Sequence, residues 1–201
     1  DSNYGGYKTD GTKMFNFNHW GNYNYGGWAG SDLRYDILGS TNKAPSGYGS
    51  AKTTSTVGYD APNTTPTNPV ANTLMAALPS DLRAVMKPVT KYTDNTAGGA
   101  DTASYVTATA DYLFLLAEFE VFGSRSYANS AEKNYQLQYD YFKNGNSKVA
   151  YNLSANSTAV WWWLRSPWYR GTGSFCIVDI NGYIYHTGAR NSGGLRPGFS
   201  V

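Results

Sequence analysis

The stretch WWWLRSP, Trp161–Pro167, decides how the rest of the chain is interpreted, because it concentrates three indole rings in seven residues. Side chains alternate between the two faces of a β-strand, so Trp161 and Trp163 should share one face and Trp162 should lie on the other. Exposure of all three rings would promote association, and we therefore expect at least two of them to be buried. We expect the closing stretch LRPGFSV, Leu195–Val201, to be buried as well, so that the two buried stretches hold the segment between them like a clamp at either end.

Between these two ends lies a segment whose composition is typical of a binding surface. Aromatic rings offer contact area, small polar groups offer adaptable hydrogen bonds, and arginines add charge and stacking. A catalytic pocket would instead need a few positioned titratable groups. The residues of interest in this segment are Trp168, Tyr169, Arg170, Thr172, Ser174, Tyr183, Tyr185, His186, Thr187, Arg190, Asn191 and Ser192.

Two strands, 174–180 and 183–187, are predicted within this segment. They flank Asn181-Gly182, the dipeptide favoured in two-residue type I′ hairpin turns. We therefore expect an antiparallel hairpin near the C-terminal end.

Alternation along the second of these strands places Tyr183, Tyr185 and Thr187 on one face. Ile184 and His186 then point the other way. Packing of the tyrosine face against a neighbouring element competes with its use for binding, and the polar and aromatic residues in the flanking loops favour binding.

The remaining pattern indicates a single α+β domain spanning 1–201, with short helices early and a small antiparallel sheet late. Segments rich in Gly, Ser, Thr or Tyr at 40–69 and 124–147 are expected to be long loop insertions. Helices with apolar residues at helical spacing are predicted at 28–38, where Ser31 can cap, at 70–77, and at 79–86, where Leu82, Val85 and Met86 should face inward. Further strands are predicted at 89–93, 148–151, 161–164 and 198–201.

The run YLFLLAEFEV, 112–121, is the strongest core candidate. Interpreted as a strand, it places Glu118 and Glu120 on one face. Because no Asp or His cluster at ligand spacing lies nearby, we expect these glutamates to pair with arginines rather than to bind a metal. Arg165 and Arg34 are natural partners, since an arginine within an apolar block has to be paired if it is buried.

Charge and hydropathy argue against two classes of partner. The formal net charge is +2 and no run of Lys or Arg occurs, whereas nucleic-acid binders normally carry a basic stripe. The longest apolar run, near 112–117, is far too short to span a membrane. Cys176 is the single cysteine and lies in the apolar run FCIV, so we expect it to be a small buried hydrophobic residue.

Taken together, these motifs resemble a C-type-lectin-like family of uncharacterised domains from gut Firmicutes and their phages. Members of that family carry a WWLRSP block, an F-C-x-V-x-x-x-G stretch and a GVRP-type ending. The matching pieces here are WWLRSP at 162–167, FCIV at 175–178 with Gly182, and GLRP at 194–197 before Phe199 and Val201. GGWAGSDLR (26–34), LPSDLRAVMKPVTK (78–91) and LFLLAEFEVFG (113–123) match as well, so the resemblance covers most of the chain.

Some members of that family are targets of diversity-generating retroelements, which rewrite adenine-containing codons to vary a ligand-binding surface on a fixed C-type-lectin fold. The resemblance implies that the residues of interest named above are the displayed positions. The implied framework is Trp162–Pro167, Phe175, Val178, Gly182, Arg196, Pro197 and Phe199. The implied function is non-enzymatic recognition of a protein or glycan, without a cofactor, from an extracellular position on a phage virion tail or a bacterial cell surface.

The wider fold group offers two alternative functions. A calcium-assisted carbohydrate-binding domain would use acids such as Asp101, Asp111 or Glu118, but the chain lacks the Glu-Pro-Asn and Gln-Pro-Asp sugar signatures. An enzyme of the formylglycine-generating type would depend on Cys176, but the chain has no second cysteine for the oxidase chemistry. Fold alone licenses neither function.

Overall fold

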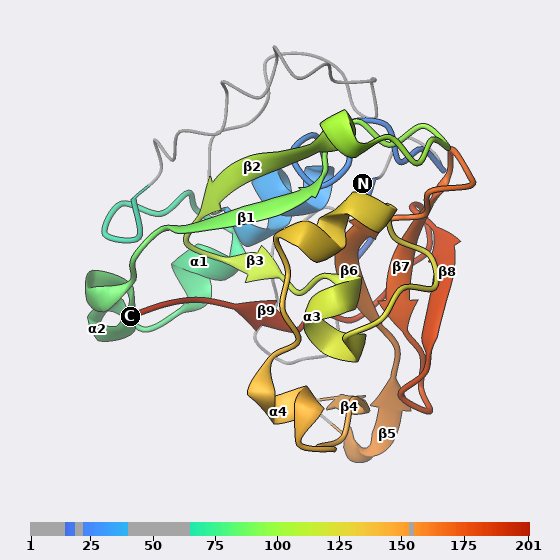
Figure 1. Ribbon diagram of the computed structural model, residues 1–201. Coiled ribbons are helices and arrows are strands. Elements are labelled where there is room, and N and C mark those ends of the chain that lie inside the picture. Colours follow the sequence, from blue (N-terminus) through green and yellow to red (C-terminus); the bar gives the residue numbers. More distant parts are fainter. Residues whose placement is uncertain (1–14, 19–21, 40–64, 153–154) are drawn as a thin grey trace.

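A computed structural model describes residues 15–18, 22–39, 65–152 and 155–201 of the chain (Figure 1). Short helices and small antiparallel sheets make up the described part, which confirms the α+β class. Most of the predicted insertion at 40–69 lies outside the described residues. Within the described residues, no helix is long and apolar enough to cross a bilayer.

A three-stranded antiparallel sheet forms the C-terminal part, drawn in orange and red in Figure 1. Its strands are β6 (Trp162–Pro167), β7 (Ser174–Val178) and β8 (Ile184–Gly188), and they lie in that order, so β8 is an edge strand. The predicted hairpin is therefore confirmed. Cys176 lies opposite His186 in the β7–β8 register.

The three successive tryptophans alternate as predicted. The Trp161 and Trp163 rings meet edge to face at 4.9 Å, and both belong to the main core with Phe175. Trp162 faces a second core, which it shares with Cys176. Trp162 and Trp163 are 1% and 0% exposed, so the expected burial of at least two indoles is confirmed.

The hairpin turn differs from the predicted type I′ geometry, which needs a positive φ at both central residues. Among the turn residues, all of which the structure describes, only Gly182 has a positive φ, of 86°. The Asp179 carboxylate accepts hydrogen bonds from the backbone N–H groups of Asn181 and Tyr183, and the Gly182 N–H donates to the Asp179 carbonyl. Because an aspartate can satisfy its own turn in this way, the loop has three residues, with the glycine at the left-handed position.

Other strands form pairs around this sheet. β1 (Val89–Asp94) pairs with β2 (Val106–Asp111) along its whole length, and β4 (Ala150–Asn152) pairs with β5 (Ala155–Val160). In Figure 1 the β1–β2 ribbon crosses the upper part of the molecule. The strands predicted at 89–93 and 148–151 are confirmed, with small shifts in their ends.

The closing stretch of the chain is less buried than predicted. Two residues of it, β9 (Pro197–Gly198), pair with β3 (Phe114–Leu115), and Ser200 then bridges to Lys87. Phe199 and Val201 are 45% and 61% exposed. The expected second buried clamp is therefore wrong, because this stretch is held mainly through its backbone and leaves these side chains open.

The helices are shorter than the sequence suggests. They are η1 (Leu33–Leu38), α1 (Leu74–Ala77), α2 (Ser80–Val85), η3 (Ala103–Tyr105), α3 (Glu118–Phe122), η4 (Ser130–Asn134) and α4 (Asp140–Lys143). The Ser31 hydroxyl accepts a hydrogen bond from the Arg34 N–H at 3.2 Å, so the predicted cap is present, although η1 begins only at Leu33. Val85 is 54% exposed and does not face inward as predicted. The segment 124–147 contains η4 and α4 and is not a structureless loop.

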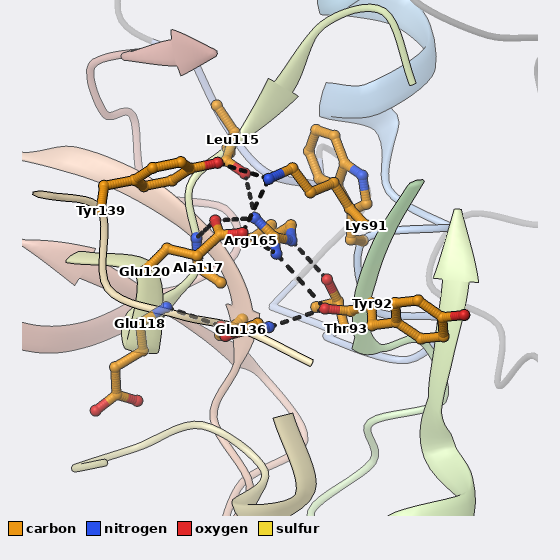
Figure 2. A network of polar contacts seen from close by, with 12 residues as sticks. Lys91, Tyr92, Thr93, Leu115, Ala117, Glu118, Glu120, Gln136, Tyr139 and Arg165 are labelled. Atoms are coloured by element: carbon orange, nitrogen blue, oxygen red, sulfur yellow. Dashed lines mark hydrogen bonds and ion pairs between the residues drawn. The ribbon is translucent and has the colours of Figure 1, made fainter. Parts of the chain in front are cut away.

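The largest correction concerns Glu118 and Glu120. Both belong to the helix α3 rather than to a strand. Residues two positions apart are separated by about 200° around a helix, so the two carboxylates point in different directions (Figure 2). The Glu120 side chain turns back to accept the Ala117 N–H at 2.9 Å and so helps to begin the helix.

Candidate binding surface

The residues predicted to be displayed lie in three adjoining parts of the C-terminal sheet. One is the loop 168–173 between β6 and β7 together with Ser174, the first residue of β7. The second is β8 with the residue before it, and the third is the loop 189–192 that follows β8. We call these three parts the 168–192 surface. Its exposed members are Arg170, Thr172, Tyr183, Tyr185, Arg190, Asn191 and Ser192, and its half-buried members are Trp168, Tyr169, Ser174, His186 and Thr187.

The outer face of β8 presents the most exposed rings of this surface. Tyr183 and Tyr185 are 70% and 55% exposed. Thr187 follows at the same spacing, and its hydroxyl accepts a hydrogen bond from the Asn191 amide at 2.5 Å. The opposite face carries Ile184, which packs against the second core. One face of the edge strand is thus anchored while the other is open.

His186 lies on the anchored face and joins the surface to the core. The Trp168 ring stacks on His186 with centroids 4.0 Å apart, and Tyr127 meets it edge to face at 4.8 Å. Burial lowers the pKa of His186, and its Nδ1 atom is buried without a hydrogen-bond partner. Trp168 and His186 are therefore uncharged, stacked rings that support the surface from beneath and do not protrude from it.

A second aromatic contact extends the surface to residues outside the predicted segment. The Arg125 guanidinium lies 4.0 Å from the Tyr169 ring centroid, and the Arg170 guanidinium lies 5.0 Å from it. Arg125 is itself held by an ion pair with Asp101 at 2.7 Å. Sequence reasoning missed Arg125 and Tyr127, because both lie in the segment interpreted as an insertion.

The buried side-chain amide of Asn24 helps to hold the loop 168–173, together with the Asn24 backbone N–H, which donates to the Thr172 carbonyl at 2.8 Å. Its Nδ2 atom donates to the carbonyls of Trp168, Gly171 and Ser174 at 3.3, 2.7 and 3.0 Å. Its Oδ1 atom accepts the Gly98 N–H at 3.2 Å. Asn24 is fully buried, so these bonds fix the backbone of the loop from beneath.

The loop after β8 is held in a similar way by Asn22, whose Oδ1 atom accepts the Arg190 N–H at 3.0 Å. Asn22 and Asn24 lie two residues apart in a segment that the sequence marks only as irregular loop. The two-residue separation of Asn22 and Asn24 was the one feature of the sequence that could have indicated their related roles, since extended residues two apart point the same way. Both loops are thus held through their backbones by the same short segment.

Two glycines set steric limits within and beside the surface. A Cβ atom at Gly171 would lie 2.3 Å from the Trp168 ring, and one at Gly193 would lie 2.1 Å from the Trp161 ring. Gly193 also pairs with Phe15 through backbone hydrogen bonds of 2.7 and 2.9 Å. Real Cβ contacts are never so close, so a larger residue at either position would displace an indole.

A buried polar network lies behind β6 and supports the sheet (Figure 2). The Arg165 guanidinium donates to both Glu120 oxygens, at 2.5 and 3.0 Å, and also to the Thr93 hydroxyl and the Leu115 carbonyl. The Lys91 ammonium reaches Glu120 at 3.0 Å. Burial opposes the charge of Glu120, but Arg165 and then Lys91 outweigh it and lower its pKa to about 2.

The predicted arginine pairing is confirmed for Arg165 but not for Arg34. Arg34 is paired with Asp111 at 2.8 Å, and both side chains are fully buried. Glu118 has no arginine partner. It accepts backbone N–H groups of the segment 126–128, which places Tyr127 and neighbouring Arg125 beside the surface.

A third buried glutamate, Glu132, lies close to the same network. It accepts hydrogen bonds from the Asp94 N–H, the Ser166 hydroxyl and the Gln136 amide. Burial outweighs these donors and raises the pKa of Glu132 to about 7. Because its donors are all neutral groups, burial prevails and Glu132 is easily protonated near neutrality.

The residues named for the two alternative functions have other partners in this fold. Asp101 is paired with Arg125, Asp111 with Arg34, and Glu118 with backbone N–H groups. In the part of the chain that the structure describes, no three or more His, Cys, Asp or Glu side chains gather where they could hold a metal ion. Burial, reinforced by neighbouring Glu118, raises the pKa of the Cys176 thiol well above its usual range, so this thiol is closed to solvent and protonated.

Comparison with known proteins places most of the chain in one family. Residues 12–201 match the family model described as Domain of unknown function (DUF6273), and the chain belongs to that family. No curated protein matches the chain. No solved structure matches it either.

Proposed function

We propose that this domain is a non-enzymatic binding module that recognises a protein or glycan through the 168–192 surface. The observation that carries the proposal is the open pair Tyr183 and Tyr185, 70% and 55% exposed on one face of an edge strand. Large rings left in solvent on a rigid strand are typical of recognition surfaces, because they offer contact area at little cost in side-chain entropy. Arg170 and Arg190, both exposed, add charge-assisted hydrogen bonds at either side.

The proposal extends to how the surface changes and where it is used. We infer a C-type-lectin-like fold, diversification of the surface by a retroelement, and display on a phage virion tail or a bacterial cell surface. Two observations support this. The motif residues Trp162–Pro167, Phe175 and Val178 are buried, whereas the displayed positions between them and Ser192 are all exposed or half-buried. Loops held through their backbones accept changes of side chain, which a diversified surface requires.

Sequencing closely related copies of this domain from one microbial population tests the diversification. Amino-acid substitutions should concentrate at the displayed positions between Trp168 and Ser192 and coincide with adenines in a template copy. Buried framework codons, such as those of Trp162 and Phe175, should differ only silently. An even spread of substitutions along the chain would refute diversification while leaving a fixed binding function open.

Binding itself is tested by screening the purified domain against a glycan array and against intact bacterial cells. A double variant, Tyr183→Ala with Tyr185→Ala, should lose about 2 kcal/mol or more of binding free energy for whatever the parent domain binds. Tyr151→Ala is the matched control, because Tyr151 is also a strand tyrosine and is also 55% exposed. Equal binding by the parent and the double variant, with both folded, would refute the assignment of the surface.

A further inference from the structure

A pocket with a volume of about 500 Å³ opens between α4 and the closing stretch of the chain. It shares no residue with the 168–192 surface. Half of its lining residues are aromatic, and the side chains that matter below are Phe114, Tyr139, Tyr141, Phe142, Arg196 and Phe199. Its size lies within the range of small-molecule sites, which are mostly apolar with a few polar groups that fix the ligand.

Arg196 is the polar group that distinguishes this pocket. Its guanidinium lies 5.3 Å from the ring centroids of Phe142 and Trp162 and 5.6 Å from that of Tyr141. Its Nη1 atom is buried and unsatisfied, and no described residue accepts a hydrogen bond from the guanidinium or forms an ion pair with it. An arginine has five N–H donors, and leaving buried donors unmatched is unfavourable.

The contrast with Arg165 shows how unusual this arrangement is for the chain. Arg165 is fully buried, and its donors reach a carboxylate, a hydroxyl and backbone carbonyls. Arg196 has rings around it but no acceptor. A planar fork of donors beside an apolar hollow matches a carboxylate, which accepts two parallel hydrogen bonds from one guanidinium.

From this geometry we propose that the pocket binds a small aromatic carboxylate, with the acid group on Arg196 and the ring against the aromatic wall. Part of that wall is already fixed. The Lys91 ammonium donates to the Tyr139 hydroxyl at 2.6 Å (Figure 2). It also lies 4.2 Å from the Phe114 ring centroid. The stacking partners of the ligand ring are therefore in place before it binds, which favours binding.

Asp140 provides a second test, because this acidic residue also lines the pocket. Asp140 is exposed, so its charge is screened by solvent but still opposes an incoming anion. The two charges should thus act in opposite directions on an acidic ligand. A ligand held only by apolar contact would respond to neither.

The test uses phenylacetate and its neutral counterpart phenylacetamide, titrated into the unmodified protein by calorimetry. Phenylacetate should bind, and phenylacetamide should bind at least about tenfold more weakly, because the amide loses the charge-assisted pair with Arg196. Equal affinities for the two compounds would overturn the proposal. Absence of phenylacetate binding at about 10 mM would overturn it as well.

Variants then locate the site. Arg196→Met should weaken phenylacetate binding at least about tenfold, Asp140→Asn should strengthen it about twofold, and Arg190→Met, an exposed arginine elsewhere, should leave it unchanged. If Arg196→Met does not fold, Phe199→Ala and Tyr141→Ala replace it, since these side chains are 45% and 50% exposed and each should weaken binding. Undiminished binding by the folded Arg196→Met variant, or by both replacements, would refute the site.

Discussion

Arg165 and Trp168 are three residues apart at the end of β6, yet they belong to regions built on opposite principles. Around Arg165, buried side chains are held by one another and by backbone carbonyls, and each charge depends on another. Around Trp168, the side chains largely face outward, and the loop is held through its carbonyls by Asn24. A substitution in the buried network around Arg165 should therefore destabilise the fold strongly, whereas a substitution in the exposed loop around Trp168 should destabilise it little.

The largest expected effect comes from removing the central cation of the network. Arg165→Met should lower the free energy of unfolding by about 3–5 kcal/mol, because it leaves the Glu120 carboxylate buried beside only Lys91. Chemical denaturation measures the change. Arg170→Met is the matched control on the exposed side and should shift stability by no more than about 0.5 kcal/mol. Similar losses in the two variants would remove the contrast between the regions.

A pH series should reveal the second largest effect, through Glu132. Its pKa is about 7 in the folded protein and 4.5 ordinarily, so folding strengthens proton binding. Its contribution to stability is therefore complete below pH 4.5 and is lost as the pH rises through 7, by about 3 kcal/mol in all. Unfolding measured across this window should show the decline, and Glu132→Gln should make it shallower; burial also raises the pKa of Asp94 and of Glu118, which supply the rest.

Glu120 should control the acidic limb of the same pH series, where stability falls as the pH is lowered. Its pKa is about 2 in the folded protein and 4.5 ordinarily, so its stabilisation is present above pH 4.5 and is lost as the pH falls toward 2. Glu132→Gln should leave this acid limb unchanged. A parent protein that becomes more stable between pH 4.5 and 7 would contradict the assignment of a raised pKa to Glu132.

A smaller effect is expected where a buried side chain holds exposed backbone. Asn24→Ala should lower stability by about 2 kcal/mol, because it leaves carbonyls of the 168–173 loop without their donor. Hydrogen exchange and limited proteolysis should report loosening confined to that loop. Asn24→Asp keeps an acceptor for the Gly98 N–H but removes the donors, and it should loosen the loop equally. If the 168–173 loop stays rigid in both variants, the Asn24 side chain does not hold it.

The smallest effect on folding is expected at the open face of β8. Tyr185→Ala should change the free energy of unfolding by about 0.5 kcal/mol or less, because more than half of the side chain is already in solvent. Thermal and chemical unfolding provide the measurement. A loss above about 1 kcal/mol would mean that Tyr185 stabilises the fold through Tyr127, which it meets edge to face at 6.1 Å, rather than serving recognition.

The same contrast explains which features the sequence could predict. Trp161, Trp162 and Trp163 follow strict alternation, because in a strand buried on both faces the pattern and the packing agree. The run around Glu118 misled because a continuous apolar run has no period that separates a strand from a short helix. Its helix depends on Glu120, which turns back to the Ala117 N–H while pairing with Arg165.

Contacts of long sequence separation account for what the sequence missed at the candidate surface. Alternation correctly separated Tyr185 from Ile184, but nothing local to Asn24 indicates three carbonyls nearly 150 residues away. Arg125 and Tyr127 reach the surface only because Glu118 holds the backbone between 126 and 128. The turn type was predicted wrongly for the opposite reason, since the side chain of Asp179, two residues before the predicted Asn181-Gly182 loop, overrode the Asn-Gly signal.

The steric limits at Gly171 and Gly193 coincide with a property of the codons for glycine. A Cβ atom at Gly193 would displace the indole of Trp161, which is not a displayed position, and a Cβ atom at Gly171 would displace the indole of Trp168 in every copy that keeps this tryptophan. Every glycine codon begins with two guanines, and an adenine can occur only at its silent third base. Under the proposed adenine-directed rewriting, these two positions are therefore protected by their codons rather than by selection against failed copies. The positions where the fold requires glycine would then be positions that adenine-directed rewriting cannot change.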